Sequence, residues 1–503
     1  MKKNKKFLVL YILTAILFCV GTVISVAATW IASNFTVGIQ EILFTLNNPM
    51  NGANTDVVSI GLKACLPLVA VCVAGIILIL CVDYKTRIQI LLSGKIIGIP
   101  CKIRLSKWMR IGALLLGVVL VIGSVWKLDT ALGISDYLQL KLQRTTIYEE
   151  YYVDPAEVTI SAEKPKNLIY IYMESMETNF QSKQEGGVCK ENLIPHLTQM
   201  AKENISFSHN EQVGGFRSLG GTYWTTGALL GSGSGVPFSF PVEGSSMNNY
   251  TYFAPGLTTM GDILEEKGYN QVFLCGSDSD FGGRKSLYTQ HGNFEIFDLF
   301  TAREKGYIPK DYFKWWGFED EILYKIAKDE LNRLSKAGQP FNLTMLTVDT
   351  HMVGGYVCDL CGDTYPNPSE NVFACADKQV YEFVKWCRQQ PFFEDTVIVI
   401  SGDHMCRDTT VIGSMHDFDH TVYNCFINAD APEKLHTKNR DFCSLDMFPT
   451  VLSAMGFTFE GDRLGLGTNL FSDAQTLAEE MGIDVFTQEL YKYSEFYMDE
   501  FAQ

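Results

Sequence analysis

Basic residues are scarce in this chain, and they are unevenly distributed. Lys and Arg number 41 against 57 Asp and Glu, which gives a formal net charge of −16. Up to Leu128 there are 13 basic and 3 acidic residues, so the remainder carries 28 basic and 54 acidic ones. An acidic remainder excludes nucleic acid as the expected partner, because neutralising phosphates requires clustered Lys and Arg. The chain also lacks a repeat of fixed period, and it has no low-complexity tract or run of like charges that would indicate a disordered tail.

Three long apolar segments near the amino terminus are typical of transmembrane helices. They run over about 7–30, 62–82 and 111–128, and the third is slightly short but extendable at either end. A cleaved signal peptide is the alternative for the first segment, which follows four lysines. Its apolar core is longer than that of a signal peptide, however, and it lacks a clear cleavage site. We therefore expect residues 1–128 to form a transmembrane region with three helices.

The basic residues of this region predict its orientation. No Lys or Arg occurs between Lys6 and Lys63, whereas 83–110 carries seven against a single acid. By the positive-inside rule the amino terminus and the second loop are cytoplasmic. Three spans then place everything after Trp126 outside the cell. The expected localisation is a multi-pass protein of the cell membrane with an extracellular catalytic domain.

After a linker at 129–166, with a helical stretch near Tyr137–Tyr151, apolar runs alternate with helix-like segments through 167–503. This alternation predicts an α/β fold with a mainly parallel sheet, and the near-continuous apolar strands predict burial on both faces. The acidic tail after Ser472 is expected to be helical and to lie on the surface. The other expected elements are helices at Leu193–Glu203, Gly261–Lys267, Glu319–Ala337 and Glu382–Arg388, and strands at Asn270–Leu274, Phe341–Val348, Val397–Ser401 and Val422–Ile427.

Four short sequences place acid, hydroxyl or imidazole groups directly after an apolar run. They are NLIYIYMES (167–175), FLCGSD (273–278), LTMLTVDTH (343–351) and VIVISGDH (397–404). Open α/β sheets build their active sites at the carboxyl ends of parallel strands. The recurrence therefore predicts one converging site.

Two carboxylates and an imidazole in these sequences form a ligand set for a divalent metal. They are Glu174, Asp403 and His404, and this combination suits Mn²⁺, Mg²⁺ or Zn²⁺ with an open position for substrate. Taken singly, Asp403 is compatible with a strand-end turn and Glu174 with a helix start. Their joint placement after separate strands favours a metal site.

A Gly-rich region at 214–238 supplies hydroxyl groups and runs into the helix-compatible sequence TTGALLGS. This arrangement exposes backbone N–H groups and the positive end of a helix to an anion such as phosphate. A Thr at a helix start is normally an N-cap, but a nearby metal lowers the pKa of a hydroxyl and makes it a nucleophile. Thr222, Thr225 and Thr226 are all candidates on spacing.

Together these motifs resemble the phosphoglycerol transferase and lipoteichoic acid synthase branch of the alkaline phosphatase/sulfatase superfamily. Glu174-Ser175 matches an E-S motif after the first strand, Gly221 to Thr225 matches G-x-x-x-T, and Gly402-Asp403-His404 matches G-D-H. RLGLGTNLFS (463–472) is similar to a late motif of the phosphoglycerol transferases, and the resemblance covers about 167–472. It implies that Thr225 attacks phosphorus and that Glu174, Thr225, Asp403 and His404 bind the metal, with Mn²⁺ as first choice.

The resemblance also implies substrate-binding residues. His351, in DTHMVGG, corresponds to a catalytic and substrate-binding His near the scissile phosphate, although an ordinary loop His is the alternative. Ser277, Asp278 and Arg284, in GSDSDFGGR, correspond to the headgroup pocket, where Arg284 would clamp a phosphate unless it forms a surface salt bridge. The aromatic residue of the synthases near that Arg is replaced by Gly282 or Gly283. His291, His416 and His420 are weaker candidates, and His420 is expected to be structural or to support the site.

The implied activity is transfer of glycerophosphate from phosphatidylglycerol, through a covalent threonine intermediate, to a glycolipid, polymer or glycan of the cell envelope. A sulfatase or phosphodiesterase of the same fold is an alternative, but the C/S-x-P-x-R sequence of sulfatases is absent around Thr225. A phosphoethanolamine transferase is another alternative with the same type of nucleophile. A catalytically inactive membrane sensor or scaffold predicts lost ligands, yet all four metal positions are filled.

Nine of the 14 cysteines follow the last apolar segment. Outside the membrane some could form disulfides, and Cys358, Cys361 and Cys375 are the first candidates because they are expected to share one loop. A zinc knuckle built on Cys358-x-x-Cys361 needs a second ligand pair, which is not found nearby. The sequence leaves their pairing open.

Overall fold

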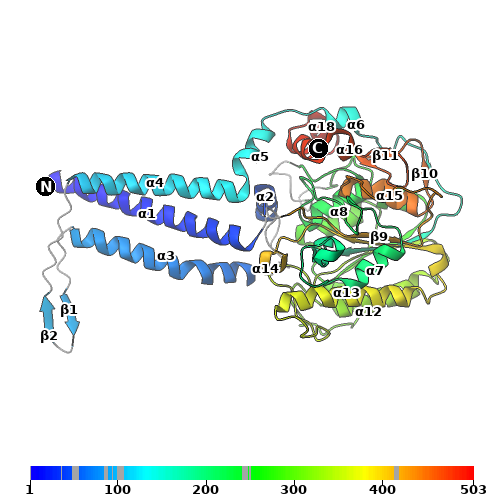
Figure 1. Cartoon of the computed structure of the whole chain (residues 1–503), viewed down its shortest axis with the longest axis horizontal. Coiled ribbons are helices and arrows are strands. Elements are labelled where there is room, and N and C mark those ends of the chain that lie inside the picture. Colours follow the sequence, from blue (N-terminus) through cyan, green and yellow to red (C-terminus); the bar gives the residue numbers. More distant parts are fainter. Residues whose placement is uncertain are drawn as a thin grey trace. The chain divides into compact units, whose positions relative to one another are not determined.

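The computed structural model describes residues 2–35, 37–47, 56–83, 89–92, 95–98, 107–240, 247, 251–412 and 418–502 (Figure 1). The chain divides into two compact units. The first comprises residues 1–38 and 55–135, and the second comprises residues 39–54 and 136–503.

The first unit contains three long apolar helices, α1 (Lys2–Asn34), α3 (Asp56–Asp83) and α4 (Lys107–Leu132), and a hairpin of β1 (Gln89–Leu92) and β2 (Lys95–Gly98). Each of the three helices is long and apolar enough to cross a membrane. Helices α1 and α4 approach closely at a glycine, since a Cβ at Gly21 would lie 2.8 Å from Leu120. The Ser124 hydroxyl donates a hydrogen bond to the carbonyl of Gly21 at 2.7 Å. Small residues and hydroxyl bonds of this kind are the usual means by which apolar helices pack.

The second unit is built on a six-stranded sheet of order β6-β5-β7-β4-β8-β9. All neighbours pair in parallel except β9, which runs antiparallel to β8 at one edge. The mainly parallel sheet predicted from the sequence is confirmed. The strands are β4 (Asn167–Met173), β5 (Asn270–Cys275), β6 (Glu295–Phe297), β7 (Phe341–Leu346), β8 (Thr396–Gly402) and β9 (Asn424–Ile427).

Helices cover both faces of this sheet, and each face has its own apolar core. Along β4, Ile169 and Ile171 point into one core, whereas Leu168 and Tyr170 point into the other. The first core is completed by α7 (Pro195–Glu203), α11 (Leu299–Glu304), α12 (Asp320–Leu334) and α13 (Pro368–Cys387), and the second by α8 (Thr225–Ser234), α9 (Met260–Glu266), α10 (Arg284–Gln290) and α15 (Met447–Ala454). In Figure 1, α12 and α13 lie on one side of the sheet and α8 and α15 on the other. Burial on both faces explains why the strands read as continuous apolar runs.

Three expected elements differ in detail. The helical stretch expected near 137–151 forms two helices, because the backbone at Thr145 turns away to donate a hydrogen bond to the carbonyl of Tyr493 at 3.0 Å. The helix expected to begin at Glu382 begins at Pro368. The acidic tail is helical as expected, but it is not confined to the surface, since its Phe486 and Tyr497 are buried in the second core. The remaining elements are α2 (Ile39–Asn47), α5 (Ile134–Lys141), α6 (Ile147–Tyr151), α14 (Thr409–Ile412), α16 (Leu477–Met481), α17 (Ile483–Tyr491), α18 (Glu495–Glu500), β3 (Ile160–Ser161), β10 (Thr458–Phe459), β11 (Arg463–Leu464) and β12 (Gly467–Thr468).

Candidate active site

The ends of β4 and β8 and the start of α8 meet at one point. Glu174 directly follows β4, Asp403 and His404 follow β8, and Thr225 is the first residue of α8. Glu174, Asp403 and His404 are buried, and each offers a ligand atom within 4.8 Å of the others. The Thr225 hydroxyl lies 3.3 Å from Oε2 of Glu174 and 3.4 Å from Nε2 of His404. The structure therefore brings together the four residues that the sequence motifs single out as metal ligands.

Hydrogen bonds between strand ends fix the position of Glu174. Its backbone N–H donates to the Thr347 hydroxyl at 3.0 Å, and its carbonyl accepts from the Thr350 hydroxyl at 2.6 Å, so β4 is tied to the end of β7. Ser175 has a φ of 55°, a left-handed conformation that turns its own N–H toward Oδ1 of Asp403, 2.8 Å away. The Ser175 hydroxyl donates to Oε1 of Glu174 at 2.7 Å. The E-S pair therefore orients both carboxylates at once.

The surroundings of His404 select its tautomer. Its Nδ1 lies 2.8 Å from the carbonyl of Met405, which can only accept, so the proton is on Nδ1. Nε2 then presents its lone pair toward Glu174 and Asp403, at 3.7 Å and 3.3 Å from their nearest oxygens. A ring held by a backbone carbonyl at one nitrogen and free to bind with the other is the usual geometry of a metal-ligating His.

The pKa values of these groups reflect burial and the proximity of the two carboxylates. Burial, then the charge of Glu174, raises the pKa of Asp403 to about 7. Burial also acts to raise the pKa of Glu174, but the charges of His351 and His404 outweigh it and the pKa is lowered. Burial acts to lower the pKa of His404, and the two carboxylates reverse that effect and raise it. Oδ2 of Asp403 is buried without a hydrogen-bond partner among the described residues, so the donor set fits a divalent cation.

The three candidate threonines have different environments. Thr222 is fully buried, and its hydroxyl is occupied by the backbone of Leu219. The Thr226 hydroxyl donates to the carbonyl of Gly282 at 3.0 Å. Among the three, Thr225 is the one that contacts Glu174 and His404. The spacing of the residues carries no signal that distinguishes them, because the distinction depends on which face of the loop and helix points toward β4 and β8.

A pocket adjoins Thr225 and contains most of the residues expected to bind substrate. Its lining includes Glu174, Thr225, Ser277, Arg284 and His351. Arg284 is only 5% exposed, and its Nη2 donates to the Ser277 hydroxyl at 3.1 Å. It is therefore not a residue of a surface salt bridge. The structure places His351 at this pocket rather than in a remote loop.

Two aromatic side chains of this pocket were not predicted. Trp316 packs on His351 with ring centroids 4.5 Å apart, and Phe281 packs on Trp316 at 5.4 Å. Both line the pocket and give it an aromatic surface. Gly282 has a φ of 64°, and a Cβ there would lie 2.6 Å from the Thr226 hydroxyl, so a side chain at this position is disfavoured. Trp316 comes from a loop more than thirty residues away in sequence from Phe281, and no local pattern indicates it.

Other candidate residues lie outside this pocket. Asp278 is beside it, where its carbonyl accepts from Arg284 at 2.8 Å and its carboxylate accepts from the N–H of Asp280. His291 bonds to Asp262 at 3.0 Å and to the carbonyl of Phe253 at 2.8 Å, which is a structural role. His420 lies 2.7 Å from the buried carboxylate of Glu177. His416 lies outside the described residues.

Helix α2 belongs to the second unit and packs beside the start of α8. Phe44 is 7% exposed, and its ring lies 5.2 Å from those of both Trp224 and Phe238. The Gln40 amide donates to the carbonyl of Phe238 at 3.0 Å. Glu41 forms a buried ion pair with Arg407, three residues after His404. Sequence reasoning missed this helix because it lies in the loop between the first two apolar segments.

Comparison with known proteins defines the class to which this fold and site belong. Residues 166–457 match the family model described as Sulfatase. The chain belongs to this family of enzymes, and the resemblance drawn from its motifs is confirmed. A protein of the alkaline phosphatase superfamily from Vibrio parahaemolyticus shares the fold, with a TM-score of 0.50 at 21% identity over 65% of this chain and 76% of its own.

More particular relatives are named phosphoglycerol transferase I. The protein of that name from Salmonella choleraesuis is 31% identical over 384 residues, which covers 74% of this chain and 47% of the relative. The chain therefore spans about half the length of the curated relatives it matches. The lipoteichoic acid synthase LtaP from Listeria monocytogenes also matches, with a TM-score of 0.47 at 19% identity over 63% of this chain and 79% of its own.

Proposed function

We propose that this protein is a metal-dependent phosphoglycerol transferase that acts at the outer face of a membrane, similar to lipoteichoic acid synthases. The observation that supports this most is the position of the Thr225 hydroxyl, 3.3 Å from Glu174 and 3.4 Å from His404, at the mouth of a pocket that also holds Arg284 and His351. The name and 31% identity of the Salmonella relatives favour the same activity.

Glu174, Thr225, Asp403 and His404 would hold one divalent ion. Two carboxylates, a hydroxyl and one imidazole form a predominantly oxygen donor set, which suits Mn²⁺ best, with Mg²⁺ and Zn²⁺ also compatible. When bound, the ion would lower the pKa of the Thr225 hydroxyl and offset the negative charge that develops on the phosphoryl oxygens.

In the first half-reaction the Thr225 hydroxyl loses its proton to water, and its oxygen attacks the phosphorus of phosphatidylglycerol. A bond forms between that oxygen and phosphorus, and the bond between phosphorus and the diacylglycerol oxygen breaks. His351, which lines the same pocket as Thr225, would give a proton to the departing alkoxide. The products are diacylglycerol and a glycerophosphoryl ester on Thr225.

In the second half-reaction a hydroxyl of the acceptor attacks the same phosphorus. The acceptor hydroxyl gives its proton to His351, which released one in the first half-reaction. The bond to Thr225 breaks, and the threonine oxygen recovers a proton from water. The acceptor, which is a glycolipid, polymer or glycan of the cell envelope, leaves with one glycerophosphate added. The two chemically similar displacements use one site in alternation, as expected for a covalent, ping-pong transferase.

Arg284 and its neighbours are suited to hold the donor headgroup. The guanidinium is buried, lines the pocket and donates to the Ser277 hydroxyl, so it would favour a phosphate bound there. Trp316 and Phe281 form an apolar wall next to His351. Such a wall excludes water, which would otherwise compete with the acceptor for the covalent intermediate.

A lipid donor requires the site to face the membrane surface, and the arrangement of α2 favours the predicted orientation. This helix lies in the loop between the first and second apolar helices, yet it packs in the same unit as the domain that follows the third. Both segments must then be on one side of the membrane, as the two crossings between them require. The scarcity of basic residues before Lys63 assigns that side to the outside.

The test is donor turnover by the full-length protein and its variants. Thr225→Ala should reduce diacylglycerol release from phosphatidylglycerol on the order of a thousandfold or more, because the nucleophile is lost. Thr225→Ser should retain measurable activity, and Thr289→Ala, which alters an exposed threonine on α10, should leave it unchanged. A Thr225→Ala protein with wild-type turnover contradicts the proposal. Preferential use of phosphatidylethanolamine would instead identify a phosphoethanolamine transferase.

A further inference from the structure

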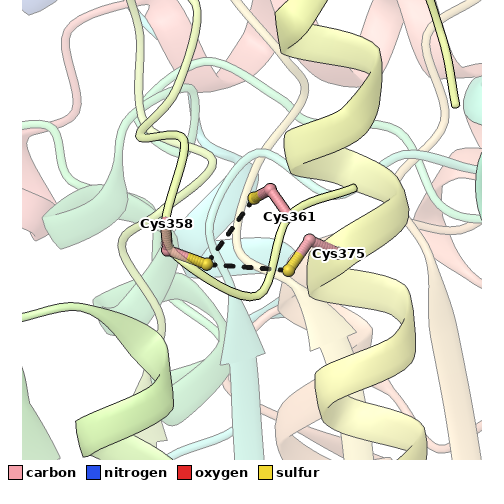
Figure 2. Close-up of side chains that lie close together, drawn as sticks. All are labelled: Cys358, Cys361 and Cys375. Atoms are coloured by element: carbon pink, nitrogen blue, oxygen red, sulfur yellow. Dashed lines mark hydrogen bonds between the residues drawn. The ribbon is translucent and has the colours of Figure 1, made fainter. Parts of the chain in front are cut away.

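Three cysteine side chains gather outside the candidate active site. Cys358 and Cys361 lie in the loop between β7 and α13, and Cys375 lies two turns into α13. Figure 2 shows the three side chains pointing toward one another. Cys358 and Cys375 are buried and Cys361 is half-buried. This loop also carries His351, seven residues before Cys358.

The sulfur separations are those of ligands around a common ion. The Sγ atom of Cys358 lies 3.5 Å from that of Cys361 and 3.7 Å from that of Cys375, and all three atoms lie within 4.8 Å of one another. Thiolates bound to zinc at about 2.3 Å in a tetrahedral arrangement are about 3.8 Å apart. All nine cysteines after the third apolar helix are free thiols in the described residues. Cys358 is nearly equidistant from its two neighbours, so the arrangement does not single out one pair.

The surroundings of the cluster favour a cation. The side-chain amide of Gln379, one turn after Cys375, donates to the sulfur of Cys375 at 3.4 Å and lies 4.0 Å from that of Cys358. An N–H donated to sulfur stabilises a metal-bound thiolate. Asp349 is buried, and its Oδ2 has no partner among the described residues. Its carboxyl lies near enough to Cys358 for the two groups to interact electrostatically.

We propose that Cys358, Cys361 and Cys375 bind one zinc ion through three thiolates. Soft sulfur ligands select zinc over the harder ions suited to the carboxylate site, so the two sites would be chemically distinct. The ion would join the β7–α13 loop to α13 and hold the segment that follows His351. This site does not depend on the phosphotransfer proposal, and its role is structural.

The test is the zinc content of the full-length protein purified in detergent without chelator. Zinc should remain bound in a Glu174→Gln/Asp403→Asn variant, which disables the carboxylate site, and should fall by about one ion per chain when Cys375→Ser is added to it. Cys387→Ala, which changes a buried cysteine on the same helix outside the cluster, should keep the ion. Zinc that is unaffected by Cys375→Ser overturns the proposal.

A second measurement covers the case in which the cysteine variants fail to fold. Exchange of the bound ion for Co²⁺ in the Glu174→Gln/Asp403→Asn protein should produce a thiolate-to-cobalt charge-transfer absorption, and removal of the ion should speed hydrogen exchange in the loop around Tyr356. Mass spectrometry of the denatured protein should find all three thiols open to alkylation. A disulfide between any two of them, or cobalt bound without the absorption band, overturns the proposal.

Discussion

The environment of the Asp403 carboxyl favours the binding of a cation. It is buried beside the carboxylate of Glu174. The backbone N–H of Ser175 donates to Asp403, and the Ser175 hydroxyl donates to Glu174. Burial and the charge of Glu174 raise the pKa of Asp403 to about 7. Burial acts to lower the pKa of His404, but the charges of Asp403 and Glu174 outweigh it and raise that pKa. A bound divalent ion would offset the repulsion between the two carboxylates. Protons and the ion would therefore compete for the same groups.

Metal binding should therefore weaken as the pH falls. Asp403 must lose its proton and His404 must be neutral before they bind, and both pKa values are raised, so the competing protonated forms grow as the pH drops from 8 to 6. We expect the apparent affinity for Mn²⁺ to fall by about tenfold or more over this interval, since each displaced proton contributes up to a factor of ten per pH unit. Isothermal titration calorimetry at several pH values would measure this. The change in Mn²⁺ affinity per pH unit should be smaller in Asp403→Asn. An affinity of the unaltered protein that does not depend on pH would contradict the assignment of Asp403 and His404 as ligands.

Individual residues were predictable where a strand pattern led to them. Glu174, Asp403 and His404 each follow an apolar run, and parallel strand ends meet at one edge of a sheet whatever the connections between them. Thr225 was not separable from its neighbours by spacing, because the contact with Glu174 depends on the rotation of a helix start. Trp316 was missed because its approach to His351 is a long-range contact without a local pattern.

At the scale of elements, α2 is the least expected contributor to the catalytic unit. It fills the space beside Trp224, the residue that precedes Thr225, with the ring of Phe44. Its Glu41 pairs with Arg407 in the segment that follows His404. A short helix from between two membrane helices therefore supports both the start of α8 and the end of β8.

Phe44→Ala should lower the stability of the catalytic unit by about 3 kcal/mol, because it removes a buried aromatic ring and leaves a cavity. Donor turnover should fall with it, since Trp224 loses a packing partner. Leu46→Ala on the same helix is the matched control, because Leu46 is 75% exposed and should have little effect. Thermal unfolding of the detergent-solubilised protein measures the change. Equal effects of the two substitutions would show that α2 does not pack on this unit.

Most elements of the sheet and its helices were predictable, and the errors have local causes. The start of α13 carries the signals of a helix beginning, since Asn367 caps it by accepting from the N–H of Ser369 and Pro368 occupies its first position. Its first turn carries the polar residues Ser369, Glu370 and Asn371, which hid the apolar period. The strand β6 spans only Glu295–Phe297, too short for any periodicity to appear.

For the whole molecule, the distribution of basic residues and the three apolar helices predict an orientation in the membrane. In cells that express the full chain, external protease should digest the domain after α4. An epitope at the amino terminus or within 83–110 should remain protected until the membrane is opened. Immunoblotting of intact and lysed cells gives the comparison. Digestion of the amino-terminal epitope in intact cells would show that the orientation is the opposite one, and it would exclude a catalytic site on the outer face.

Different sequence patterns predicted the structures of the two units. Apolar length identified three helices of the first unit, and alternating strands and helices identified the fold of the second. The assignment of α2 to the second unit was not predictable. It is a nine-residue amphipathic helix in a loop, and its sequence does not indicate which surface it packs on.

The covalent intermediate on Thr225 is the central claim, and mass spectrometry tests it most directly. The full-length protein is mixed with phosphatidylglycerol and its metal, without acceptor, and stopped in acid before proteolysis. The peptide that contains Thr225 should gain the mass of one glycerophosphoryl group, and the gain should disappear in Thr225→Ala and when acceptor is added. Diacylglycerol release without this adduct, or an adduct on another residue, would contradict the account.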